Sequence, residues 1–191
     1  MLIHITGDSL AARAERTSDS TLSYLLSNSN QVVNTAKSGD SSGDLLERLE
    51  DDVLSKEEAD VFILLIGAND LATHKQTPLT EFEKNIRKII HCVKHVWSMT
   101  RVLLITPPAV DEEKQRYRTN YLVQSYGQVL KQIASDQGLD CLDFYELLMN
   151  RPEPLSDLME GVMDDGLHFG LDAYQILADA IQNRLSKYGP S

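Results

Sequence analysis

Three side chains near the two ends of the chain have the types of a hydrolytic triad. Ser9 stands in Gly-Asp-Ser-Leu directly after an apolar segment, and Asp165 and His168 are three positions apart near the other end. A serine hydroxyl needs a base to become nucleophilic. Histidine suits that role because its pKa lies near neutrality, and a carboxylate fixes its tautomer. Taken alone, Ser9 is better explained as a turn or cap residue and His168 as a loop residue.

Two further motifs, Ser-Gly-Asp at 38–40 and Gly-Ala-Asn-Asp at 67–70, each follow an apolar segment. Attack on an ester carbonyl creates an oxyanion, which needs preorganised hydrogen-bond donors. Gly39 can expose its backbone N–H because glycine lets a ligand approach closely. The side-chain NH₂ of Asn69 and the backbone N–H of Ser9 would be the other two donors. The alternatives are a turn glycine at 39 and a turn or cap residue at 69, but all the motifs together favour the catalytic interpretation.

Asp8 and Asp70 flank the candidate nucleophile and the candidate oxyanion donor. An acid at such a position is more often a helix cap than a catalyst. We therefore expect both side chains to have a supporting role.

The segments that must position these residues alternate between strand and helix patterns. Short segments bounded by polar, glycine or proline residues predict strands at 2–6, 31–34, 61–66, 102–106 and 139–143. The third and fourth are continuously apolar, as expected of strands covered on both faces. Helices are predicted after an apparent capping box at Thr80–Glu83, with an apolar face from Phe82 to Trp97, and over 117–134 and 172–185.

This alternation predicts a single α/β domain over residues 1–191, a three-layer α/β/α sandwich with a five-stranded, flavodoxin-like parallel sheet. Sites in such sheets lie beyond the carboxyl ends of the strands, where the strand order reverses. Ser9, Gly39, Asn69 and Thr106 would all lie there. The irregular segment 150–166 would deliver Asp165 and His168 just ahead of the last helix.

This set of residues resembles the GDSL, or SGNH, hydrolase family, and the resemblance extends from Gly7 to His168. It implies the SGNH hydrolase fold, with Ser9 as nucleophile, His168 as base and Asp165 as the acid that orients it. It also implies an oxyanion hole formed by the N–H groups of Ser9 and Gly39 and by the Asn69 amide. Ala36 stands where many relatives have glycine. The segment Thr-Pro-Pro-Ala-Val-Asp-Glu-Glu at 106–113 is similar to the isoamyl acetate esterase branch.

The resemblance implies a lipase/acylhydrolase that cleaves a small or short-chain acyl ester through an acyl-serine intermediate, without a cofactor. The same residues would serve a carbohydrate O-deacetylase, a thioesterase or a lysophospholipase, and they do not separate these activities. An alternative of another class is a receiver domain or other flavodoxin-like binding module, which Asp8, Asp70 and Thr106 match superficially. That alternative leaves Asp165 and His168 unexplained.

A second serine motif, Gly39-x-Ser41-x-Gly43, fits the nucleophile elbow of α/β-hydrolases. Too few strands precede Ser41 to supply the oxyanion loop of that fold. Ser41 and Asp44 are better explained as a helix-capping box. We therefore keep the nucleophile at Ser9.

The composition limits the partners of this chain. It has 191 residues and a formal net charge of −11, which argues against nucleic acid and anionic membranes as partners. No signal peptide or membrane-spanning segment is recognised, so a cytoplasmic location is expected. His91 and His95 have a metal-ligand spacing but no evident third ligand, so we expect no metal site. The oligomeric state is left undecided.

Overall fold

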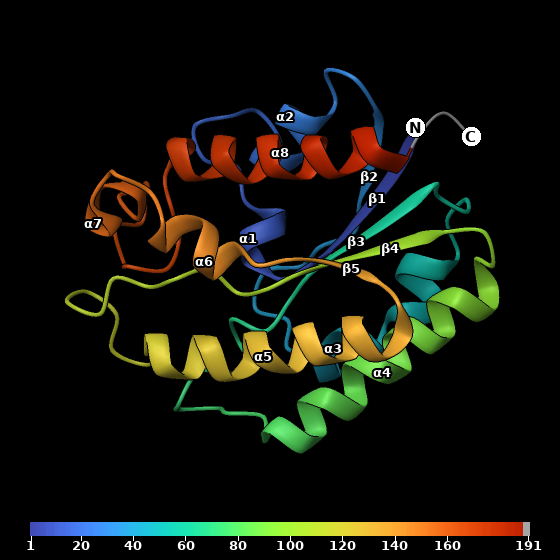
Figure 1. The fold of residues 1–191 in the computed structure, drawn as a ribbon, viewed down its shortest axis with the longest axis horizontal. Helices are drawn as coiled ribbons and strands as arrows, with labels where there is room; N and C mark the ends of the chain where they lie inside the picture. The colour runs from blue at the N-terminus through green and yellow to red at the C-terminus, as the bar shows by residue number, and fades with distance from the viewer. Residues whose placement is uncertain (189–191) are drawn as a thin grey trace.

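Five parallel strands form the central sheet of the protein, which the computed structural model describes over residues 1–188 (Figure 1). In their spatial order the strands are β2 (Gln31–Asn34), β1 (Leu2–Gly7), β3 (Val61–Leu65), β4 (Arg101–Ile105) and β5 (Asp140–Leu142). The predicted five-stranded parallel sheet is confirmed, with every strand end within one residue of its predicted position. Residues 189–191 of the predicted domain lie outside the described residues.

Helices cover both faces of this sheet and make the predicted three layers (Figure 1). One face carries α1 (Ser9–Ala12), α2 (Thr21–Leu26) and α8 (Leu171–Leu185). The other face carries α3 (Ser42–Glu47), α4 (Leu79–Val96) and α5 (Asn120–Gln137). Shorter elements connect them: a π-helix (Leu49–Leu54), α6 (Phe144–Met149), α7 (Leu155–Leu158) and a terminal 3₁₀ turn (Ser186–Tyr188).

The core follows the apolar pattern of the sequence. All five residues of β3 are buried, because helices cover this central strand on both sides. The apolar face expected for α4 is also buried, from Phe82 through Val93 to Trp97. Burial of these side chains supplies the hydrophobic stabilisation that holds the two helical layers on the sheet.

Two helix starts differ from their predictions. The capping box expected at Thr80 is wrong: α4 begins at Leu79 after Pro78, and no side chain caps its N-terminus. The helix expected from Tyr117 begins at Asn120, where the Thr119 hydroxyl accepts the Leu122 N–H at 3.3 Å. Residues 117 and 118, which precede Thr119, belong instead to the loop after β4.

The segment 150–166, expected to be irregular, contains the single turn of α7. In Figure 1 it lies at the end of the sheet where the strands finish, together with the loop after β4. Both segments therefore reach the carboxyl edge at which the site is expected.

The sheet order reverses between β1 and β3, whose carboxyl ends lie side by side. Gly7 ends β1 opposite Leu65 with φ +150°, and an added Cβ would stand 1.8 Å from the Leu65 carbonyl oxygen. Only glycine permits this approach. Gly7 therefore lets the ends of β1 and β3 pack closely, immediately before the Asp-Ser-Leu turn.

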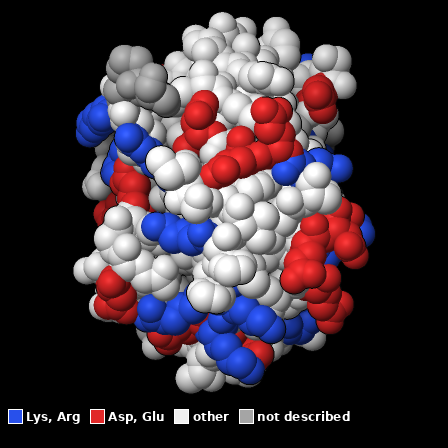
Figure 2. All heavy atoms as spheres, turned by 90° about the vertical axis from the view of Figure 1, so that its right-hand side faces the viewer, with Lys and Arg blue, Asp and Glu red and all other residues white. Residues whose placement is uncertain are grey.

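The opposite end of the molecule, where the strands begin, carries acidic and basic side chains interspersed with neutral ones (Figure 2). Within residues 1–188, no helix combines the length and the apolar composition needed to cross a membrane.

Candidate active site

A continuous chain of hydrogen bonds joins the three residues of the predicted triad. Ser9 Oγ lies 2.9 Å from His168 Nε2, and His168 Nδ1 lies 2.8 Å from Asp165 Oδ2. Ser9 is 9% exposed, and the side chain of His168 is 14% exposed. The imidazole thus bridges the hydroxyl and the carboxylate in the geometry that general-base catalysis requires.

The turn from Asp165 to His168 holds the acid and the base together. Asp165 Oδ1 accepts the backbone N–H groups of Leu167, at 3.0 Å, and of His168, at 2.9 Å. Burial raises the pKa of the Asp165 carboxyl, but the bonds from His168 and Leu167 outweigh it and hold that pKa well below its usual range. Asp165 is therefore ionised, and its Oδ2 accepts a hydrogen bond from the Nδ1–H of His168.

The loop after β4 anchors this turn from the side. The Asp111 N–H donates to the Gly166 carbonyl at 2.9 Å, and Gln115 Nε2 donates to the Asp165 carbonyl at 3.1 Å. Lys114 forms an ion pair with Asp164. These contacts fix the position of the acid relative to the sheet.

Asp8 supports Ser9 as the cap of α1. Its Oδ1 accepts the Leu10 N–H at 2.9 Å, while its Oδ2 has no hydrogen-bond partner among the described residues. Asp8 is fully buried, and this burial raises the pKa of its carboxyl to about 7, although the Leu10 bond opposes the shift and the charge of Asp70 adds to it.

Two of the three candidate oxyanion donors, Gly39 and Asn69, lie on adjoining loops. Gly39 has φ +92°, a conformation that favours glycine. Asn69 reaches from the loop after β3 and donates through Nδ2 to the Asp40 carbonyl at 3.0 Å. This bond holds the Asn69 amide beside the residue that follows Gly39, and it uses one of the two amide hydrogens.

Asp70 ties the same two loops together. Its carboxylate accepts the Ser42 N–H at 2.9 and 3.0 Å and the Ser42 hydroxyl at 2.6 Å. Burial raises the pKa of Asp70, while the two donors of Ser42 lower it. The supporting position expected for Asp70 is thus a buried contact between the loop after β3 and the first turn of α3.

Ser41 does not form a nucleophile elbow. Its Oγ lies 2.6 Å from Asp44 Oδ2, and the Ser41 N–H donates to the same carboxylate at 2.8 Å. The predicted capping box is confirmed as the N-terminus of α3.

Thr106 directly follows β4, at the carboxyl edge where it was expected, but among the described residues it forms no hydrogen bond with the triad. It is fully buried, and its hydroxyl accepts the Phe144 N–H at 2.8 Å on the β5 side. Arg118, which was not among the predicted site residues, contacts the loop of Asn69. The signal was a lone arginine in a segment predicted to be helical.

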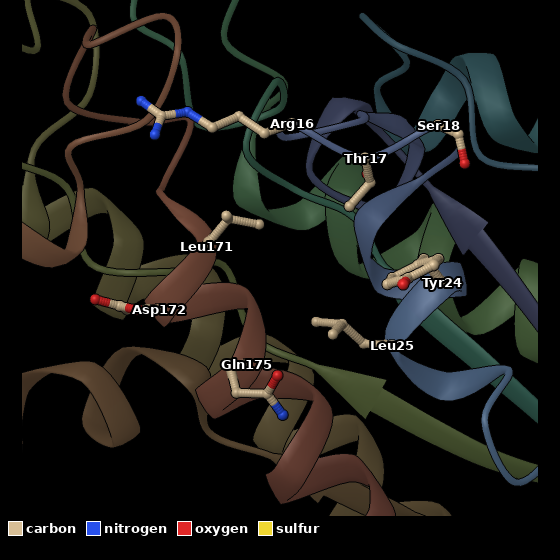
Figure 3. A pocket seen from close by; sticks show the side chains of 8 residues that line it. All are labelled: Arg16, Thr17, Ser18, Tyr24, Leu25, Leu171, Asp172 and Gln175. Atoms are coloured by element: carbon tan, nitrogen blue, oxygen red, sulfur yellow. The ribbon is translucent and has the colours of Figure 1, made fainter.

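One cavity of the structure reaches the candidate oxyanion loop, and another lies against different elements. One, of about 550 Å³, begins at Gly39 and continues past Lys37 and Arg48 along the acidic side chains of α3 and the π-helix. Another, of about 530 Å³, lies between α2 and α8, where Tyr24 and Leu25 face Leu171 (Figure 3). The second cavity is lined by none of the candidate active-site residues.

His91 and His95 are exposed on α4 with their rings stacked 6.3 Å apart. No group of three His, Cys, Asp or Glu side chains is placed to hold a metal ion in the part of the chain that the structure describes.

Comparisons with known proteins identify the family of this chain. The model of the GDSL-like Lipase/Acylhydrolase family matches residues 5–176. A flavodoxin-like sheet with a serine, histidine and aspartate at its carboxyl edge is the arrangement of a hydrolase, and the chain belongs to the GDSL-like lipase/acylhydrolase family. This match argues against the receiver-domain alternative, which shares the strand order but not the family.

Curated relatives include a GDSL esterase/lipase of Arabidopsis thaliana, 25% identical over 66% of this chain and 58% of its own length. The isoamyl acetate-hydrolyzing esterase 1 homolog of Bos taurus is 30% identical over 55% of this chain and 47% of that protein. The chain thus spans about half the length of the curated relatives that it matches.

Solved structures are similar over nearly the whole chain. The lipase/acylhydrolase from Enterococcus faecalis has a TM-score of 0.85 and 25% identity, covering 100% of this chain and 98% of that one. An acetyl-xylooligosaccharide esterase mutant from Geobacillus has a TM-score of 0.74 and 23% identity, covering 95% and 92%. The second likeness shows the fold alone.

Proposed function

We propose that this protein is a serine esterase that cleaves a small or short-chain acyl ester through an acyl-serine intermediate. The observation that carries the proposal is the bridge formed by His168, 2.9 Å from the Ser9 hydroxyl and 2.8 Å from the Asp165 carboxylate. The isoamyl acetate-hydrolyzing relatives support a small ester as substrate.

In the first half-reaction, His168 Nε2 takes the Ser9 proton as Oγ forms a bond to the acyl carbon. The tetrahedral intermediate collapses when the bond to the leaving oxygen breaks, and the imidazolium protonates the departing alcohol. Asp165 keeps the imidazole oriented and stabilises its charged form.

In the second half-reaction, water attacks the acyl-serine while His168 takes its proton. The carbon–oxygen bond to Ser9 breaks, the proton returns to Oγ, and the carboxylic acid leaves. The oxyanion would be bound by the N–H groups of Ser9 and Gly39 and by Asn69; within residues 1–188 neither backbone N–H has an acceptor. These steps need no metal or cofactor.

Hydrolysis of p-nitrophenyl acetate by the wild type, Ser9→Ala and Ser41→Ala tests the nucleophile. We expect Ser9→Ala to lose on the order of a millionfold in kcat, and Ser41→Ala to keep the wild-type rate. Loss of activity in Ser41→Ala alone would move the nucleophile to the other serine. Equal activity of all three proteins would end the proposal.

A carbohydrate O-deacetylase is the second candidate. The charged cavity of about 550 Å³ beginning at Gly39 suits an alcohol rich in hydroxyl groups, because carboxylates such as Glu47 and Asp51 accept hydrogen bonds from hydroxyls. A panel of short-chain esters, acetylated xylooligosaccharides, acyl-CoAs and lysolipids separates the alternatives. For a deacetylase, Glu47→Gln would lower kcat/KM for the acetylated sugar and leave p-nitrophenyl acetate unaffected.

A further inference from the structure

The guanidinium of Arg118 lies buried against the loop that carries the candidate oxyanion donor Asn69. Arg118 is 9% exposed and donates to three neutral oxygens, the Ala68 carbonyl at 2.6 Å and the side-chain carbonyls of Asn69 and Gln115, both at 3.3 Å. No carboxylate within residues 1–188 forms an ion pair with it. A buried charge without a paired carboxylate is costly, so its presence needs an explanation.

This charge persists in the folded protein. Burial lowers the pKa of the Arg118 guanidinium, while the negative charges of Asp8 and Asp165 raise it. Arginine has so high an intrinsic pKa that it stays ionised at every pH at which the protein is folded. The site therefore contains a fixed cation next to Asn69.

Two contacts together determine which way the Asn69 amide faces. Its Nδ2 donates to the Asp40 carbonyl at 3.0 Å, and its Oδ1 accepts from Arg118 Nη2 at 3.3 Å. A flipped amide would place its NH₂ against the guanidinium and its oxygen against the Asp40 carbonyl, and both contacts would be repulsive. In the observed orientation the second Nδ2 hydrogen remains available to a ligand.

Arg118 also connects the oxyanion loop with the acid of the triad. Its Nη1 donates to Gln115 Oε1, and Gln115 Nε2 in turn donates to the Asp165 carbonyl at 3.1 Å. A single chain of hydrogen bonds thus extends from Asn69 through Arg118 and Gln115 to Asp165.

We propose that Arg118 is a positioning residue, which holds the Asn69 amide as an oxyanion donor and places a fixed positive charge behind it. This inference rests on the proposed esterase function. Negative charge develops on the carbonyl oxygen only in the transition state, so a cation behind the donor stabilises that state more than the bound ester. Its removal therefore lowers kcat and leaves KM nearly unchanged.

The test is a double-mutant cycle between Arg118→Met and Asn69→Ala, measured as kcat and KM for p-nitrophenyl acetate. Arg116→Met is the matched control, because Arg116 is exposed and only two positions away. We expect Arg118→Met to lose about 100-fold in kcat, comparable to the loss of one oxyanion donor, and Arg116→Met to match the wild type. In the Asn69→Ala background, Arg118→Met should cost several times less in kcat than in the wild-type background, because no amide remains to be positioned and only the effect of the positive charge is lost.

Arg118→Lys keeps the charge but not the planar group of donors, so an intermediate kcat is expected. If Arg118→Met does not fold, as judged by thermal unfolding, the same cycle with Arg118→Lys decides. Full additivity with Asn69→Ala, a loss confined to KM, or a kcat equal to that of Arg116→Met would overturn the inference. Ser9→Ala in the same assay separates the role of Arg118 from the esterase function on which it rests. If Ser9→Ala keeps its activity, the esterase function itself is contradicted.

Discussion

The Asp70 carboxylate and Ser42 are joined by hydrogen bonds from both the backbone N–H and the hydroxyl of the serine, although the residues are 28 positions apart. Asn85 Nδ2 donates to the same hydroxyl at 3.1 Å, so the contact also reaches α4. It holds the loop of Asn69 against the helix that follows Gly39. The loops that carry Gly39 and Asn69, two of the proposed oxyanion donors, therefore share one buried attachment.

Removing this attachment should reduce both stability and activity. Asp70→Ala leaves the two buried donors of Ser42 without an acceptor, which costs about 1–3 kcal/mol per unsatisfied group. We expect a lower free energy of unfolding in urea and a lower kcat. A cycle with Ser42→Ala provides the control: the double variant should lose less than the sum of the single losses. Strict additivity would show that the contact does not couple the loops.

The buried Asp8 predicts a pH-dependent stability. In the unfolded chain its carboxyl titrates near 3.8, whereas burial raises its pKa to about 7 in the folded protein. Between these values the unfolded state has released the proton that the folded state still binds, so the contribution of Asp8 to stability is lost as the pH rises. Asp8→Asn keeps a helix-capping residue and cannot ionise.

We therefore expect the free energy of unfolding of Asp8→Asn to rise relative to that of the wild type as the pH increases from about 4 to about 7. Above that window the difference should be constant. Urea unfolding at several pH values measures it, and the same exchange at the exposed Asp172 corrects for the loss of one carboxylate. A difference independent of pH would contradict the raised pKa.

The sequence predicts the sheet well because a strand buried on both faces is a continuous apolar segment in the sequence. The apolar segment of β3 cannot be accommodated as a surface strand, and the glycine and polar residues that follow each strand mark its carboxyl end. Since those ends meet at one edge, the topology predicts that Ser9 and Asn69 lie at the same edge of the sheet.

Arg118 could not be predicted in the same way. It precedes Thr119, the cap of α5, in a segment that the helical pattern from Tyr117 had assigned to the helix. Its three acceptors lie on residues 68, 69 and 115, and two of these are about fifty positions away. A polar contact at that separation has no periodicity, so only the folded chain reveals it.

The orienting acid allows a graded test of the triad. Asp165→Asn keeps the size of the side chain but removes the negative charge that accepts the hydrogen bond from His168 Nδ1–H. Comparable exchanges cost about 10⁴-fold in kcat, less than the loss of the nucleophile. We also expect a smaller pre-steady-state burst of product release for Asp165→Asn. Stopped-flow absorbance measures the size of this burst and the kcat. A wild-type kcat for Asp165→Asn would remove Asp165 from the mechanism.

An alanine at Gly39 tests whether the backbone conformation of this residue matters for activity, separately from its effect on stability. At φ +92° an alanine is strained, although nothing lies within 4 Å of the added Cβ, so the cost is conformational, about 1–3 kcal/mol. Gly138 is the matched control, because it also has a positive φ, +62°, and an open Cβ position, at the end of α5. Both alanine variants should unfold more easily, whereas only Gly39→Ala should lose about 100- to 1,000-fold in kcat, as expected when one oxyanion donor is displaced. Equal kcat values for the two variants would mean that the Gly39 N–H does not bind the oxyanion.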